Sequence, residues 1–115
     1  VLWDAALTAC LRDRAIGRAQ LEHLINQAQP PNVELRILPF DIGLHVGMAG
    51  SFTLLRFPDG LLPDAAHQEY AVGGHIVDAK WAVNQLTTLY DELRGQALDA
   101  TESLAVIAEF VDRTI

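Results

Sequence analysis

Two histidines and a glutamate lie close together in a part of the sequence where two strands are expected. They are His67, Glu69 and His75. Imidazole and carboxylate groups bind metal ions and transfer protons near neutral pH. His67 and Glu69 should share one sheet face, with His75 across the hairpin, but a slip of one residue would separate them. An exposed polar sheet face is the competing interpretation, so we predict no metal site and keep Glu69 and His75 as candidate ligand-binding residues.

A glycine-rich loop over residues 41–50 holds the other polar candidates. Its glycines permit close backbone approach, while Asp41 and His45 supply polar groups beside the apolar Phe40 and Met48. The loop could therefore line a ligand pocket. Alternatively, the glycines only satisfy backbone turns and His45 caps the loop.

Covalent catalysis and phosphate binding find no support in the sequence. Cys10, Ser51 and Ser103 lie in no recognised nucleophile motif. The spaced glycines of the loop lack the lysine of a P-loop and precede an expected strand, whereas a dinucleotide fingerprint opens a helix. The single cysteine excludes an internal disulfide, and the four scattered histidines show no zinc-ligand spacing. We predict no catalytic residue and no cofactor, and we expect a binding protein more than an enzyme.

Aromatic residues occur along most of the chain, and most of them are expected in the core. Some could frame an apolar pocket between a sheet and its helices. The aromatic set is Trp3, Phe40, Phe52, Phe57, Trp81, Tyr90 and Phe110. The complete set of candidate ligand-binding residues is Phe40, Asp41, His45, Met48, Phe52, Glu69, His75 and Trp81.

The net charge of −7 arises in the second half of the chain. Residues 1–57 hold five basic and five acidic side chains, whereas residues 58–115 hold three and ten. Because DNA binding needs clustered lysine and arginine, we expect no direct nucleic-acid binding. The acidic surface could attract a basic protein partner or serve only solubility. Arg12, Arg14 and Arg18 form a candidate partner-binding cluster, unless they are simply solvated.

Apolar spacing and turn residues predict the elements that position these groups. Helices are expected over residues 14–28, with Asp13 as the N-cap, over residues 78–97, and from Asp99 onward, where Asp99 and Glu102 resemble a capping box. Strands are expected at residues 1–3, 33–38, 51–57, 68–72 and 75–77, with Gly73 and Gly74 as the hairpin turn. The expected apolar faces are Ile16, Leu21, Leu24, Ile25 and Ala28 in the first helix and Leu104, Ile107, Ala108 and Val111 in the last.

The order of these elements predicts an α+β fold, a mainly antiparallel sheet backed by helices with two helices at the C-terminal end. No linker or repeat divides residues 1–115, so we expect one domain in which a single layer of sheet carries the helices. The opening residues show no leader, and no apolar run is long enough for a membrane span. We expect a cytoplasmic protein.

Several phrases resemble the family called domain of unknown function 5753, which follows an N-terminal helix-turn-helix in actinobacterial antitoxin-like regulators. They are Gln20 to Leu24, Pro31 to Val33, Ile37 to Phe40, Gly43 with His45, Phe52 to Phe57, Glu69 with Tyr70, Tyr90 to Leu93, Ala97 with Leu98, and Glu102 with Ser103. The resemblance implies a small protein partner, since proteins of domain of unknown function 397 are often encoded beside such regulators. Residues 1–115 hold no helix-turn-helix, so we expect either a fragment or a stand-alone relative.

These observations favour an effector-binding or partner-binding regulatory domain that does not contact DNA itself. Its contacts would be a small protein partner, a second copy of the chain, or a small hydrophobic ligand. The alternative is a stand-alone small-molecule-binding protein or cyclase-type enzyme of a natural-product pathway, with an apolar, aromatic-lined pocket. The last helices could also form a homodimer interface.

Overall fold

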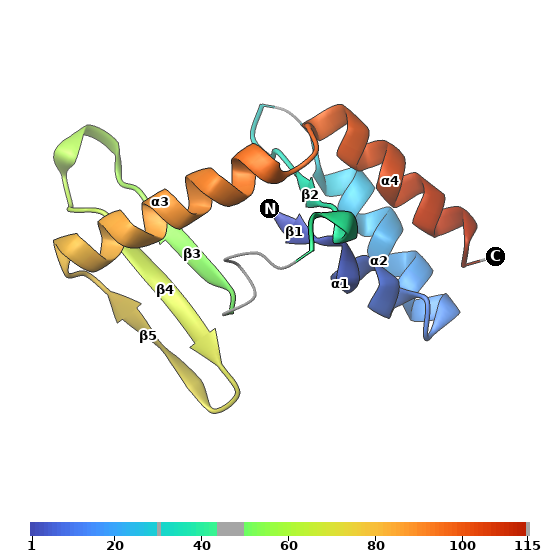
Figure 1. Cartoon of the computed structure of the whole chain (residues 1–115), viewed down its shortest axis with the longest axis horizontal. Helices are drawn as coiled ribbons and strands as arrows, with labels where there is room; N and C mark the ends of the chain where they lie inside the picture. The colour runs from blue at the N-terminus through green and yellow to red at the C-terminus, as the bar shows by residue number, and fades with distance from the viewer. Residues whose placement is uncertain (30, 44–49, 115) are drawn as a thin grey trace. The chain divides into compact units, whose positions relative to one another are not determined.

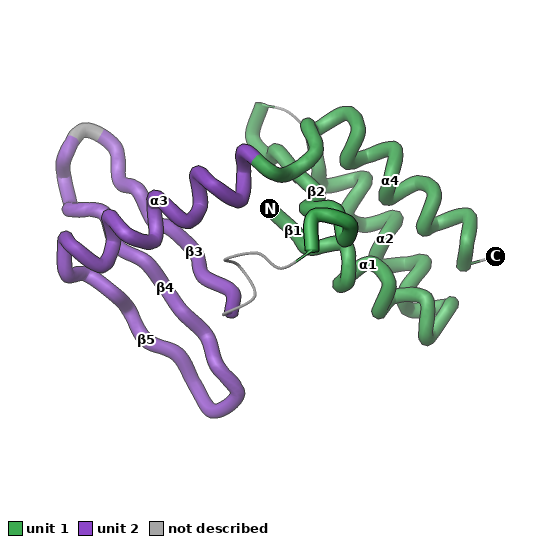
Figure 2. The backbone as a smooth tube through the Cα atoms, in the orientation of Figure 1, with its two compact units in different colours: residues 1–43, 96–115 green, residues 44–95 purple. Residues whose placement is uncertain are grey.

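Helices and antiparallel strands make up most of the chain, which confirms the α+β prediction (Figure 1). The computed structural model describes residues 1–29, 31–43 and 50–114. Two compact units form, residues 1–43 with 96–115 and residues 44–95 (Figure 2). The single-domain interpretation stays a prediction. None of the helices in the described ranges has both the length and the apolar character needed to cross a bilayer.

The first unit is built on a short parallel pair of strands, not on the antiparallel sheet that the sequence suggested. Its elements are β1 (Leu2–Trp3), α1 (Asp4–Cys10), α2 (Arg14–Gln27), β2 (Ile37–Leu38), a 3-10 helix η1 (Phe40–Ile42) and α4 (Ala100–Asp112). β1 pairs with β2 in parallel, Leu2 with Ile37 and Trp3 with Leu38. The predicted strand over residues 33–38 is therefore wrong for all but its last two residues. Its partner β1 ends where α1 begins, which limits the ladder to two pairs.

The other edge of β2 is closed by the start of α4. The Ile37 backbone N–H donates to the Ser103 hydroxyl oxygen (2.8 Å), and the Leu98 N–H donates to the Ile37 carbonyl (2.8 Å). Ser103 and Ile37 are fully buried. We call these two bonds the Ser103 clasp. They satisfy the two backbone groups of Ile37 that point away from β1, so neither is left unpaired in the core.

The buried face of α4 is rotated from the predicted one. The buried positions in α4 are Ser103, Ile107 and Phe110, with Leu104 and Val111 only half-buried and Ala108 exposed. Steps of four and three residues still define one helical face. The prediction missed it because a serine occupies the first of its positions. The core of this unit comprises Leu7, Leu21, Ile37, Ile107 and Phe110.

Helix α1 was not predicted, and it fixes the direction of α2. Gly17 is buried at the crossing of the two helices, and a Cβ atom built there would lie 1.7 Å from the Cys10 carbonyl oxygen. Ile16, predicted to face inward, is 70% exposed, because the glycine takes the inward position. The buried face of α2 therefore runs from Gly17 through Leu21 to Ala28.

The second unit is a three-stranded antiparallel sheet with one helix. It comprises β3 (Phe52–Leu55), a 3-10 helix η3 (Pro58–Gly60), β4 (Ala65–Tyr70), β5 (Gly73–Val77) and α3 (Lys80–Gln96), whose last residue belongs to the first unit. The strand order is β3-β4-β5. The sequence predicted a single layer of sheet, but the strands form two sheets, and β1 and β2 do not belong to this one. Its buried side chains are Ala66 on β4 and Val83 and Leu93 on α3.

The hairpin turn lies two residues earlier than predicted. Tyr70 pairs with Gly73 and Glu69 with Gly74, so the loop is Ala71 and Val72. Gly74 lies in β5, and this position requires glycine because a Cβ atom built there would lie 2.7 Å from the Gln68 carbonyl oxygen. Gly74 therefore allows close approach of the two strands, while Gly73, beside the turn, has a φ of 140°, a conformation that favours glycine.

The expectation that most aromatic residues fill the core is wrong. Among the aromatic residues named above, Phe110 is buried, while Phe40, Phe57 and Trp81 are exposed. The core of the first unit consists instead mainly of aliphatic side chains, which pack beside Phe110.

We predict that Gly17→Ala lowers the free energy of unfolding by about 3 kcal/mol, because its methyl group would overlap the Cys10 carbonyl. The control is Gly95→Ala in α3, where no heavy atom lies within 4 Å of the added Cβ. This control should raise stability by about 0.5–1 kcal/mol, the ordinary helix propensity gain. Urea denaturation measures both. Equal effects of the two substitutions would contradict the tight α1–α2 crossing.

Candidate functional site

The strand register separates the predicted histidine–glutamate cluster. His67 pairs with Ile76, Gln68 with His75 and Glu69 with Gly74. Paired residues share a face and neighbours along a strand alternate, so His67 and Glu69 lie on one face and His75 on the other. The shared face of His67 and Glu69 is confirmed, but the placement of His75 with them is wrong. Within the described ranges, no three His, Cys, Asp or Glu side chains are grouped to hold a metal.

His75 instead interacts with Tyr70, which is not one of the predicted ligand-binding residues. The Tyr70 hydroxyl and His75 Nδ1 are 3.2 Å apart, and their ring centroids are 5.7 Å apart. Tyr70 also lines a cavity of about 200 Å³ in the second unit. Its other lining residues include Phe52, Gln68, Glu69, Leu86 and Leu89. The cavity thus brings together two predicted ligand residues, Phe52 and Glu69, and reaches His75 through Tyr70.

The remaining predicted ligand residues are dispersed. Phe40 and Asp41 belong to η1 in the first unit, where Phe40 stacks on Trp3 with ring centroids 6.1 Å apart and planes at 7°. His45 and Met48 lie outside the described residues. Trp81 is 69% exposed near the start of α3. The structure therefore assembles no pocket from the full predicted set in the part of the chain that it describes.

The predicted arginine cluster lies around the start of α2. Arg12 occupies the turn before the helix, and Arg14 and Arg18 are one helical turn apart on it. The Arg18 guanidinium donates to Glu22 of the same helix at 2.9 Å. Asp13, the predicted N-cap, accepts a hydrogen bond from the Ile16 N–H at 3.1 Å, which confirms the cap. Arg18 is thus already paired within α2, which weakens the cluster as an anion site.

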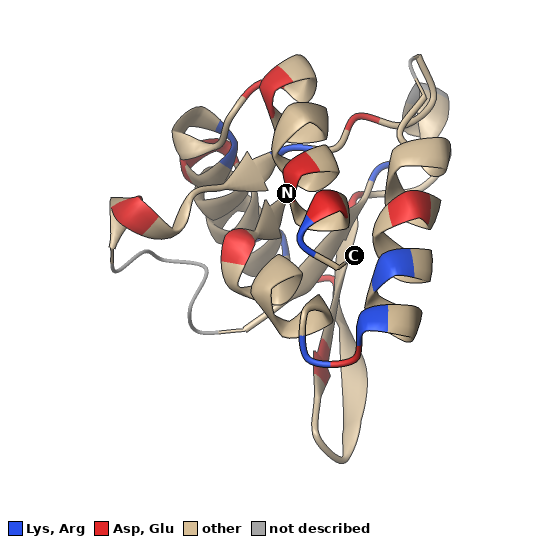
Figure 3. Ribbon diagram, turned by 90° about the vertical axis from the view of Figure 1, so that its right-hand side faces the viewer, with Lys and Arg blue, Asp and Glu red and all other residues tan. Residues whose placement is uncertain are grey.

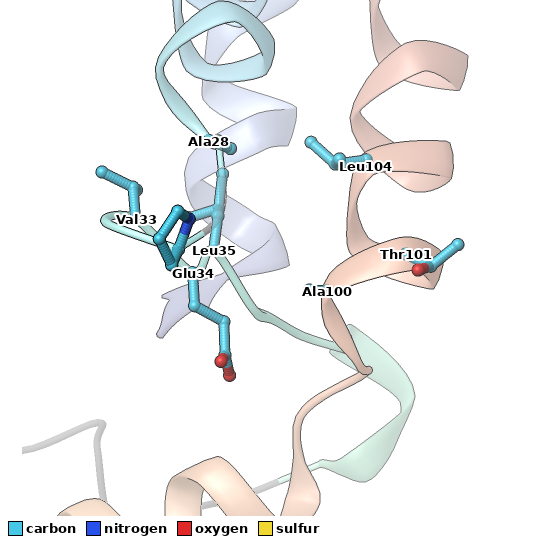
Figure 4. A pocket seen from close by; sticks show the side chains of 8 residues that line it. Ala28, Val33, Glu34, Leu35, Ala100, Thr101 and Leu104 are labelled. Carbon is cyan, nitrogen blue, oxygen red and sulfur yellow. The ribbon is translucent and has the colours of Figure 1, made fainter.

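A groove in the first unit was not predicted at all. It has a volume of about 370 Å³ and lies between the chain after α2 and the first turns of α4. Leu104 points from α4 toward Ala28, and Glu34 lies at the end nearer Ala100 (Figure 4). We call it the α2–α4 groove, lined by Ala28, Pro31, Val33, Glu34, Leu35, Ala100, Thr101 and Leu104. Residues 33–35, which the sequence placed in a strand, form one of its walls.

One carboxylate, that of Glu34, lines the α2–α4 groove, and two others lie at the start of α4. Glu34 forms an ion pair with Arg36. Asp99 caps α4, with its Oδ1 accepting from the Glu102 N–H at 2.8 Å, as the sequence predicted. Hydrogen bonds from the backbone and side chain of Glu102 lower the pKa of Asp99 below its ordinary value. The hydrogen bond to Asp99 and the charge of that carboxylate raise the pKa of Glu102.

Acidic side chains are not confined to this groove. Figure 3 shows them on several helices, interspersed with fewer basic residues. The groove combines a mostly apolar lining with one carboxylate, that of Glu34, which is paired with Arg36. Its sequence signal was weak because its lining residues come from two segments far apart in the chain.

The chain was compared with models of known protein families. A family model described as Domain of unknown function (DUF5753) matches residues 1–109. The chain belongs to this family. The resemblance inferred from the sequence is confirmed at the level of this domain. No curated protein matches the chain, and no solved structure does.

In this DUF5753 domain, Asp99→Ala should destabilise the fold most at neutral pH. The folded-state pKa of Asp99 lies below its ordinary value, so its stabilising contribution is present above pH 3.8 and is lost as pH falls through the folded pKa. The difference in thermal unfolding midpoint between the native protein and Asp99→Ala should therefore become smaller as the pH falls. Thermal unfolding from pH 7 to pH 2 measures it.

The matched control is Asp112→Ala, which removes the same charge from the last turn of α4. A carboxylate is unfavourable at a helix C-terminus, so this variant should not lose stability at pH 7. A loss equal to that of Asp99→Ala would show that total charge, not the cap, explains the effect.

Proposed function

We propose that the chain is the C-terminal effector-binding and partner-binding domain of an antitoxin-like helix-turn-helix regulator and does not itself contact DNA. The observation that carries this proposal is the DUF5753 match over residues 1–109. The regulator context rests on the resemblance of the sequence phrases to such proteins. Binding would be to a small protein partner, with self-association as a further possibility.

The α2–α4 groove supports a binding role. Its volume of about 370 Å³ falls in the range of ligand and side-chain pockets, and most of its lining is apolar. A net charge of −7 opposes contact with DNA phosphates and favours a basic partner. A domain with these properties would transmit a signal to an attached DNA-binding domain by binding, without chemistry of its own.

A stand-alone ligand-binding protein or cyclase-type enzyme is the second candidate, favoured by one observation. The cavity of the second unit combines Phe52 and Tyr70 with Leu86, Leu89 and Glu69. A second cavity of the same unit, of about 390 Å³ and lined in part by Phe52 and Tyr90, falls within the usual 300–1,000 Å³ of small-molecule sites. The regulatory proposal takes precedence because the DUF5753 match supports it.

The proposal is tested by co-purifying the chain with a small protein of domain of unknown function 397, the partner that the resemblance implies. Native mass spectrometry should find a complex of fixed stoichiometry, and an unrelated small protein of similar charge should form none. A chain that stays alone with the small protein and instead carries a discrete organic ligand would overturn the proposal and favour the second candidate.

A further inference from the structure

Strand β5 forms one edge of the three-stranded sheet in the second unit (Figure 1). Its first residue, Gly73, pairs with Tyr70 across the two-residue hairpin loop. The pair that closes such a loop exchanges backbone hydrogen bonds, and hydrogen-bonded pairs alternate with non-hydrogen-bonded pairs along an antiparallel ladder. The backbone N–H and C=O groups of Gly74 and Ile76 therefore point away from β4, toward the edge of the sheet.

This edge lacks the features that usually protect an edge strand. Such strands carry charged residues, proline or a bulge, which prevent pairing with another chain. Residues 73–77 contain no lysine, arginine, carboxylate or proline, and their register with β4 is continuous. In the part of the chain that the structure describes, β5 pairs with no strand other than β4, and Ile76 is 58% exposed. The edge is therefore open to the addition of a further strand.

The sequence of β5 fits an antiparallel copy of itself. With His75 opposite His75, Gly74 lies opposite Ile76 and Gly73 opposite Val77 of the second copy. Gly74 and Ile76, whose polar groups point outward, then form the hydrogen-bonded pairs. Each glycine faces a β-branched side chain, which fills the space that glycine leaves on the sheet surface. A shift of the register in either direction would pair fewer of these residues.

Charge also favours a second copy of the chain at this edge. Two chains of net charge −7 repel each other, so they approach most easily where neither presents a carboxylate. Asp78, the first acidic residue after β5, falls opposite Val72 of the second copy, so this register sets no like charges directly opposite each other. A partner segment of either charge would find no charged side chain on β5 to pair with.

We infer that β5 is a self-association edge, at which two copies of the chain pair antiparallel about His75 and join their three-stranded sheets. This inference rests on the self-association that the proposed function includes, and it names the surface. The contact is small, because β5 contributes five residues from each copy. The dimer should therefore be weak, with a dissociation constant on the order of 100 µM.

Cysteine crosslinking of the full chain tests the register, in a Cys10→Ser background that removes the native thiol. His75→Cys places two thiols at a directly opposed, non-hydrogen-bonded pair, whose Cα atoms lie about 4.5 Å apart, within disulfide range. Ile76→Cys is the matched control on the same strand, because its two copies would be diagonal neighbours about 7–8 Å apart. Under mild oxidation, His75→Cys should form the linked dimer about tenfold faster than Ile76→Cys. Equal rates would overturn the inference.

Removal of an outward-pointing N–H tests the backbone pairing by a second route. Ile76→Pro deletes a donor that points away from β4, so the β4–β5 ladder keeps its own hydrogen bonds. Analytical ultracentrifugation should find the dimer in the native chain and in Ile76→Val, which keeps the N–H, and only monomer in Ile76→Pro. Circular dichroism checks that the variants are folded, and the crosslinking result decides if Ile76→Pro is not. A native chain that is monomeric at about 1 mM, or dimerisation of Ile76→Pro equal to that of Ile76→Val, would overturn the inference.

These outcomes are distinct from the co-purification result. A chain that binds the small partner protein but stays monomeric without it overturns the β5 inference and leaves the partner-binding function in place. A chain that dimerises through β5 but binds no small partner has the opposite meaning. A monomeric chain whose Ile76→Pro variant no longer binds the small partner would assign this edge to that partner and overturn the self-pairing.

Discussion

The hydrogen bond from the Ile37 N–H to the Ser103 hydroxyl is the interaction on which the first unit depends. A two-residue parallel pair is too short to be stable alone, so β2 needs a partner on each edge. β1 occupies one edge, and Ser103 with the Leu98 N–H occupies the other. Because Ile37 is fully buried, water cannot replace these bonds, and their loss would leave polar groups unpaired in an apolar core.

The clasp also determines where the groove forms. It fixes the first turn of α4 against β2, and the same turn supplies Ala100, Thr101 and Leu104 to the groove. The other wall of the groove follows α2. The close α1–α2 crossing at Gly17 fixes the direction of this helix, which ends beside Ala28. Two local constraints, a buried hydroxyl and a glycine, therefore position both walls of the groove that supports the proposed binding role.

Patterns confined to one element could be read from the sequence. Apolar periodicity predicted α2, α3 and α4, and the N-caps Asp13 and Asp99 were predicted from residue type and position. Three features that depend on contacts between elements were missed or misplaced. The sequence analysis gave Ser103 no packing role and gave Gly17 no role at all, and it placed the hairpin turn at Gly73 with Gly74. Each is explained only by the backbone that packs against it.

The candidate site was less predictable than the fold for the same reason. The groove joins residues 28–35 to residues 100–104, and no pattern in a single chain reveals that pairing. The predicted cluster of His67, Glu69 and His75 failed because His75 pairs with Gln68, which places its side chain on the face opposite to His67 and Glu69. Tyr70, which contacts His75, gave no signal beyond its position near the hairpin.

Native-state amide hydrogen exchange at Ile37 tests this account most directly. The Ile37 amide should be among the most slowly exchanging amides of the first unit, while Val72 in the exposed hairpin turn exchanges quickly. Ser103→Ala should reduce the protection of Ile37 by about 1–3 kcal/mol, and Thr101→Ala, an exposed position in the same turn of α4, should not. Rapid exchange of the Ile37 amide in the native protein, or unchanged protection in Ser103→Ala, would contradict the Ser103 clasp as the constraint on which the unit is built.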